Sequence, residues 1–149
     1  MVFAWAQFLM DLQPLLVLVT GEGHLHGFSH TYIGASLIGV AAALSGKCAA
    51  EFGLRFLELS RYLPVLWPVV VLSALIGSYS HVLLDSLMHA DLQPFAPFSL
   101  DNPFLGVVSI EALHQFCVYS GAVGAAVFFG LAHWRKRRLA GPDGVEDGR

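Results

Sequence analysis

The sequence predicts an all-α membrane protein with about four transmembrane helices and one amphipathic interfacial helix. Hydrophobic residues make up 56% of the chain and charged residues only 13%, whereas soluble domains carry about 25% charged residues. The mean hydropathy is +0.64. Four apolar segments are also long enough, or nearly so, to cross about 30 Å of hydrocarbon. Because backbone groups in lipid must form their hydrogen bonds within the segment, we expect these segments to be helices.

The four predicted spans cover residues 2–20, 28–45, 64–89 and 107–133. The first contains Asp11, Gln13 and Pro14 and has no Lys or Arg, which favours a membrane helix with a polar spot over a secretory signal peptide. Small residues, which let helix backbones approach closely, recur in the second span: Gly34, Ala35, Gly39 and Ala42.

Residues 47–63 have a different pattern, with one charged face and one apolar face at helical spacing. The charged face is formed by Lys47, Glu51, Arg55 and Glu58. We therefore expect an interfacial helix that lies on the membrane between the second and third spans.

The positive charges predict the orientation. Lys and Arg follow the second and fourth spans, the latter as the block 135–138, whereas residues 21–27 and 90–106 contain none. By the positive-inside rule, both termini are cytoplasmic in the cell (inner) membrane, and the other connections face the opposite side.

Residues 1–138 are predicted to be a single membrane domain, and residues 139–149 a disordered cytoplasmic tail. Four basic residues beside a span set topology and do not indicate nucleic-acid binding. The two cysteines, Cys48 and Cys117, form no CxxC motif.

Histidines and carboxylates gather near the predicted non-cytoplasmic ends of the spans. His81, Asp85 and His89 follow one another at i, i+4 steps, so on a helix they share an arc of roughly 80°. Ionisable groups at membrane depth are costly and usually functional. The other candidates at this level are Asp11, His26, His30, Asp91, Glu111 and His114.

Imidazole and carboxylate groups together are typical ligands of a divalent metal. A catalytic zinc uses three protein ligands and keeps one position for water, whose pKa it lowers toward about 7. We predict His26, His30, His81 and Asp85 as metal ligands, with zinc as the first choice at about one ion per chain. Asp85 can instead orient a histidine.

Asp11 and Glu111 are the candidate catalytic acids or bases, although Asp11 can complete the ligand shell and Glu111 can be a simple N-terminal helix charge. His89, Asp91 and His114 are additional candidates.

Several motifs resemble those of the YdjM-like family of membrane-bound metal-dependent hydrolases. His26-Gly27-Phe28-Ser29-His30-Thr31 is similar to the family's HRGxTHS element, and Gly77 to Asp85 (GSYSHVLLD) is similar to its GYLSHLLLD element. Asp11-Leu12-Gln13-Pro14 resembles the first acidic motif, although Gln13 stands where the family often has an acid, and Pro94 to Phe98 resembles the PLLWP stretch. The resemblance covers about residues 3–120, and the matched positions are Asp11, His26, His30, His81 and Asp85.

The resemblance implies a small polytopic hydrolase, sometimes called phospholipase-like. We therefore expect a membrane-embedded, metal-dependent hydrolase that acts on a lipid-borne ester or phosphoester, with membrane lipid as its partner. The segment 91–102, rich in Phe and Pro, either admits a lipid or anchors the chain at the interface. The alternative function is a non-catalytic component that binds metal or relays protons or ions. The substrate and the oligomeric state stay open.

Overall fold

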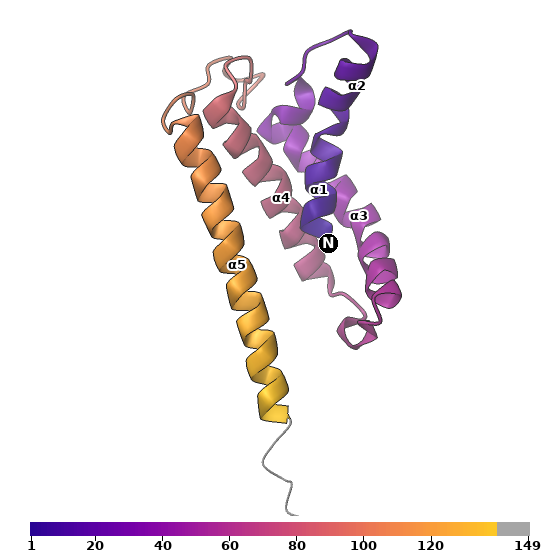
Figure 1. Ribbon diagram of the computed structural model, residues 1–149. Coiled ribbons are helices and arrows are strands. Elements are labelled where there is room, and N and C mark those ends of the chain that lie inside the picture. The colour runs from indigo at the N-terminus through magenta and orange to yellow at the C-terminus, as the bar shows by residue number, and fades with distance from the viewer. Residues whose placement is uncertain (140–149) are drawn as a thin grey trace, which may run out of the picture. The chain divides into compact units, whose positions relative to one another are not determined.

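The computed structural model describes residues 1–139, and every regular element in that range is helical (Figure 1). Four helical stretches are long and apolar enough to cross a membrane: Val2–Thr20, Tyr32–Phe56, Trp67–Met88 and Ile110–Arg135. This confirms the predicted fold class. All but the first residue of the predicted disordered tail lie outside the described residues.

The chain divides into two compact units, Met1–Val107 and Val108–Arg149. The first unit contains α1 (Val2–Met10), α2 (Leu12–Thr20), α3 (Tyr32–Phe56) and α4 (Trp67–Met88), with short 3-10 turns at Phe28–His30 and Ser60–Tyr62. The second unit contains α5 (Ile110–Leu139). The single membrane domain predicted for residues 1–138 stays a prediction.

The first predicted span is interrupted at Asp11, between α1 and α2. Pro14 explains the break, because proline has no N–H to donate to the carbonyl of Met10 four residues earlier, and its ring clashes with that carbonyl. Backbone bonds on either side persist, from Asp11 N to Gln7 O at 3.2 Å and from Leu15 N to Asp11 O at 3.0 Å. The interruption places an acidic side chain part-way along an apolar stretch.

The second span and the amphipathic segment form one helix. The sequence predicts a separate interfacial helix from residue 47, whereas α3 runs without a break to Phe56. Its charged face fastens the connection to α4: the Lys47 ammonium contacts the Glu51 carboxylate and donates to the Val65 carbonyl at 2.7 Å. The Glu51 carboxylate also accepts from the Val65 amide at 3.2 Å. These charges therefore hold a connecting loop.

Small side chains form the interior of the first unit. One core cluster contains Val2, Ala6, Ala42, Ala43, Ala50, Val70 and Ala74, where α1 packs against α3 and α4. Helix backbones approach so closely that a Cβ added at Gly77 would lie 3.0 Å from the Phe3 carbonyl oxygen. Large apolar side chains such as Leu16, Leu72 and Phe52 point outward instead. This distribution suits a bundle surrounded by lipid.

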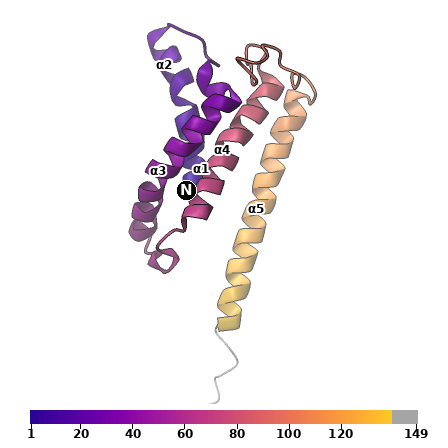
Figure 2. The same cartoon turned by 180° about the vertical axis from the view of Figure 1, so that it is seen from behind.

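The connections before α3 and after α4 lie at the same end of the first unit (Figures 1 and 2). They are fastened together, because the Tyr32 amide donates to the Pro94 carbonyl at 2.9 Å. The Asn102 side chain then closes the end of α4 by donating to the carbonyls of Ser86 at 2.8 Å and His89 at 3.2 Å. The two loops are thus held together at this end of the bundle.

Candidate metal centre

Four side chains from three segments form what we call the inner cluster: Asp11, His30, His81 and Asp85. The Nε2 atom of His81 lies 3.2 Å from Asp85 Oδ2 and 3.3 Å from Asp11 Oδ1. The Nε2 atom of His30 lies 3.4 Å from the same Asp85 oxygen. Ligand atoms bound to a tetrahedral zinc at about 2.0–2.1 Å are about 3.3–3.4 Å from one another. The three contacts within the inner cluster therefore have the spacing of neighbouring ligands in such a shell.

Gln7 orients the ring of His81. The Gln7 amide oxygen can only accept, so the proton of a neutral His81 ring sits on Nδ1, which donates to it across 2.6 Å. The Nε2 atom then presents its lone pair to the two carboxylates. A histidine that binds metal typically donates its other N–H to an oxygen in this manner.

The 3-10 turn at Phe28–His30 positions His30. Both ends of the Gln13 side chain hold this loop, since its oxygen accepts from the Ser29 amide at 3.1 Å and its NH₂ group donates to the His24 carbonyl at 3.3 Å. His30 Nδ1 is 2.8 Å from the Ser29 hydroxyl. Thr31 caps α3 by accepting from the Gly34 amide at 2.9 Å. The ring of His30 is consequently fixed and only 1% exposed.

The inner cluster leaves two buried nitrogen atoms unpaired. Among the described residues, the Nε2 atoms of His30 and His81 are buried without a hydrogen-bond partner. An unpaired buried polar atom costs on the order of 1–3 kcal/mol. The lone pair of each of these nitrogen atoms faces a carboxylate, and the two groups repel each other. A cation between the groups removes both this repulsion and the cost of the unpaired atoms. The donor set of two imidazoles and two carboxylates fits a divalent transition metal.

A second group, the rim cluster, consists of His26, His89 and Asp91. His26 Nδ1 lies 2.9 Å from Asp91 Oδ2, and the rings of His26 and His89 stack with centroids 4.2 Å apart. The hydrogen bond from His26 holds the pKa of the Asp91 carboxyl below its ordinary value, although partial burial opposes this shift. His26 also contacts the inner cluster edge to face, with its centroid 5.1 Å from that of His30.

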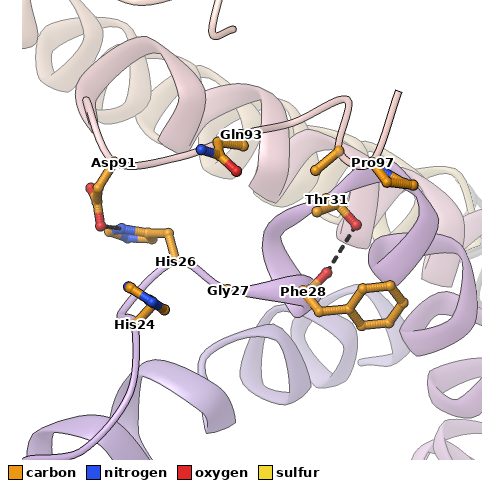
Figure 3. Close-up of a pocket in the computed structure, with 9 residues that line it drawn as sticks. His24, His26, Gly27, Phe28, Thr31, Asp91, Gln93 and Pro97 are labelled. Atoms are coloured by element: carbon orange, nitrogen blue, oxygen red, sulfur yellow. Dashed lines mark hydrogen bonds and ion pairs between the residues drawn. The ribbon is translucent and has the colours of Figure 1, made fainter. Parts of the chain in front are cut away.

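A cavity of about 470 Å³ opens beside the rim cluster (Figure 3). Figure 3 shows Asp91 pointing at His26 from the loop that follows α4. The lining residues are His24, His26, Gly27, Phe28, Thr31, Asp91, Gln93, Ala96 and Pro97. Asp11 at the other side of the inner cluster is also open, with 63% of its side chain exposed. The buried histidines are therefore flanked by accessible carboxylates.

The structure brings together seven of the nine predicted site residues: Asp11, His26, His30, His81, Asp85, His89 and Asp91. His26 and His30 reach the site from a loop, whereas the sequence places His30 inside the second span. The two others lie on α5 in the second unit, where both are exposed. Glu111 accepts from Gln115 at 3.3 Å, and His114 Nδ1 is 2.9 Å from the Ile110 carbonyl oxygen. Their roles stay predictions.

Three residues that position the site escaped the sequence reasoning: Gln7, Gln13 and Ser29. Gln7 had a usable signal, because it is the only polar side chain in the apolar run before Asp11 and precedes it by one helical turn. The sequence marks Gln13 as part of the polar spot in the first span and as a departure from an acidic motif, but not as a residue that holds the loop. No local pattern marks Ser29, whose role depends on the path of the loop.

The inner and rim clusters contain three overlapping groups with metal-ligand spacing. These are Asp11, His30 and His81; His26, His30 and Asp85; and His26, His89 and Asp91. Within each group, one ligand atom from every residue lies within 4.8 Å of the others. The site can therefore hold a metal ion, as the sequence predicts.

A family model described as a domain of unknown function, DUF4184, matches residues 55–147. That match covers more than half of the chain. The chain belongs to this family. The matched region includes His81, Asp85, His89 and Asp91, whereas Asp11, His26 and His30 precede it. No curated protein and no solved structure matches the chain.

Proposed function

We propose that this DUF4184 protein is a membrane-embedded, metal-dependent hydrolase that acts on a lipid-borne ester or phosphoester. One observation carries the proposal: the two buried Nε2 atoms of His30 and His81 converge, without hydrogen-bond partners among residues 1–139, on the Asp85 carboxylate. Such convergence at an apolar depth is costly unless the groups share a function.

The inner cluster supplies the ligands in this proposal. His30, His81 and Asp85 hold the ion, with zinc as the first choice, and Asp11 completes the shell or stays free. A bound divalent ion supplies a Lewis acid and activates water for attack on an ester or phosphoester. Gln7 and Ser29 fix the two imidazole rings, which keeps the ligand geometry ready before binding.

Asp11 is the proposed proton acceptor. Its carboxylate lies 3.3 Å from His81 Nε2, so it can take a proton at the site, and 63% of its side chain is not covered by protein. Asp85, by contrast, is 18% exposed and lies between two imidazole rings, which suits a ligand.

Access for a lipid is proposed from the outer leaflet. The cavity beside His26 and Asp91 adjoins a loop with exposed apolar side chains, including Phe98 at 88% and Leu100 at 66%. Such a loop can dip into the membrane interface. The proposed orientation, with both termini cytoplasmic and the site on the opposite side of the inner membrane, follows from the Lys and Arg distribution.

Two further points support a hydrolase over an inert metal site. A structural ion is expected in a closed shell, whereas this cluster borders a cavity and an exposed carboxylate. The five positions matched by the YdjM-like resemblance are also all among the seven residues that cluster, namely Asp11, His26, His30, His81 and Asp85.

The test uses detergent-purified protein loaded with zinc and mixed micelles of phosphatidylethanolamine and phosphatidylglycerol, with products identified by mass spectrometry. We expect release of a fatty acid or of a phosphorylated product. His81→Asn should reduce the rate by at least about 100-fold, because it removes a ligand. His133→Asn should have no effect, since His133 is exposed near the end of α5. A zinc-loaded protein that forms neither product from either lipid contradicts the proposal.

A further inference from the structure

The inner and rim clusters together present more donors than one ion can bind. Seven side chains take part in the three groups with metal-ligand spacing. A zinc ion binds four ligands and, at a catalytic site, only three from the protein. The surplus requires either that several donors have another role or that the site holds a second ion.

The donors divide without overlap into two sets of three. Asp11, His30 and His81 form one set, and His26, His89 and Asp91 form the other. Asp85 remains, and it lies between the sets: its Oδ2 atom is 3.2 and 3.4 Å from the two inner histidines, and it shares the middle group with His26. A carboxylate in this position can bridge two ions, as in two-metal hydrolases whose ions are about 3.5–4 Å apart.

We propose that the rim cluster is a second divalent-metal site, held by His26, His89 and Asp91, and that its open position faces the cavity. This extends the proposed function and rests on it only for the ion in the inner cluster. The rim ligand atoms lie within 4.8 Å of one another, while ligands of one zinc are at most about 4 Å apart. Side-chain rotation can bring these atoms to the spacing of a ligand shell, because Asp91 is 56% exposed.

Binding of an ion at the rim requires a proton of the His26 ring to move. The hydrogen bond between His26 Nδ1 and Asp91 Oδ2 holds one proton in the metal-free state. For Nδ1 to bind an ion, this proton moves to Nε2 of the same ring, and the Nδ1 lone pair and the carboxylate oxygen become ligands.

The cavity chemistry indicates what the rim ion binds. The cavity lining contains no Lys or Arg, and neither do residues 1–46 or 62–134 of the whole chain. A phosphate oxygen entering this cavity therefore has no cationic side chain to bind. A rim ion supplies that positive charge, which favours a phosphoester over a carboxylic ester as the substrate class.

The test measures metal stoichiometry. Purified protein is stripped with chelator, reloaded with Zn²⁺, passed through a desalting column and assayed by elemental analysis. We expect about two ions per chain for the wild type, and about one for His89→Asn and for Asp91→Asn. The matched control is His24→Asn, which should keep two ions, because His24 lines the same cavity but belongs to none of the groups with metal-ligand spacing.

The outcomes separate this inference from the proposed function. One ion in the wild type, unchanged in His89→Asn and Asp91→Asn but lost in His81→Asn, overturns the rim site and leaves the hydrolase proposal intact. Two ions retained in both rim variants overturn it as well, since the second ion then binds elsewhere. A wild type without any ion overturns both. If His89→Asn fails to fold, Asp91→Asn still tests the rim site, because Asp91 is an exposed loop residue.

Discussion

The amide oxygen of Gln7 lies 2.6 Å from Nδ1 of His81, and this contact joins α1 to α4 at the depth of the inner cluster. It determines which nitrogen of the ring carries the proton, and hence that the other nitrogen faces Asp11 and Asp85 with a lone pair. A neutral side chain outside the ligand set thus controls a ligand.

Replacing Gln7 tests this control. Gln7→Leu should weaken zinc binding by about 10- to 100-fold, because an unsupported imidazole loses its orientation and proton placement. Gln7→Glu should retain binding, since a carboxylate also accepts from Nδ1. Affinity is measured by competition with a chromophoric chelator. Equal affinities in wild type and Gln7→Leu would show that the contact is incidental.

Adding a methyl group to Gly34 tests the loop that carries His30. A Cβ at Gly34 would lie 2.0 Å from the Phe28 carbonyl oxygen, so Gly34→Ala must push the 3-10 turn away. We expect a loss of zinc binding and a destabilisation of about 1–3 kcal/mol. In the second unit, a Cβ at Gly121 meets nothing within 4 Å. Gly121→Ala should therefore stabilise α5 slightly, by up to about 1 kcal/mol. Melting temperatures in detergent compare the two.

Restoring a continuous first helix tests the role of the break. Pro14→Ala returns a donor for the Met10 carbonyl and should raise the helical content measured by circular dichroism. The same change should weaken zinc binding, because a regular helix carries the Asp11 carboxylate away from His81. Asp11→Asn should lower the affinity without changing the helical content. If Pro14→Ala leaves the affinity intact, Asp11 does not depend on the break.

The proposed orientation is tested by cysteine labelling in intact cells. Cys48 and Cys117 are both exposed and are first replaced by Ser. A cysteine introduced at Ser99 should react with a membrane-impermeant reagent, and one at Gly144 should react only after the cells are lysed. Labelling at Gly144 alone, or equal labelling at both positions, refutes the orientation.

The fold class was predictable because long apolar segments have few alternatives to helices in lipid. Much of the inner cluster was predictable for a similar reason, since His81 and Asp85 are separated by one helical turn in a span. The sequence predicts His26 and His30 as ligands, but it does not predict that they approach from a loop, because the path of that loop is set by Gln13, Thr31 and Gly34 together. Pro14 predicts the break at Asp11, because a proline at this position leaves the Met10 carbonyl without a backbone donor.

The alanine- and glycine-rich interior of the first unit has a consequence for its tolerance of mutation. In a water-soluble protein, truncating large buried side chains causes the greatest damage. Here most large apolar side chains are on the outside, with Met10 and Leu92 as buried exceptions, and many buried positions, such as Ala6, Ala42 and Gly77, are already near the minimum size. A saturation screen should therefore show the reverse pattern: enlargement of interior residues abolishes folding, whereas exchange among apolar residues on the outer surface goes almost unnoticed.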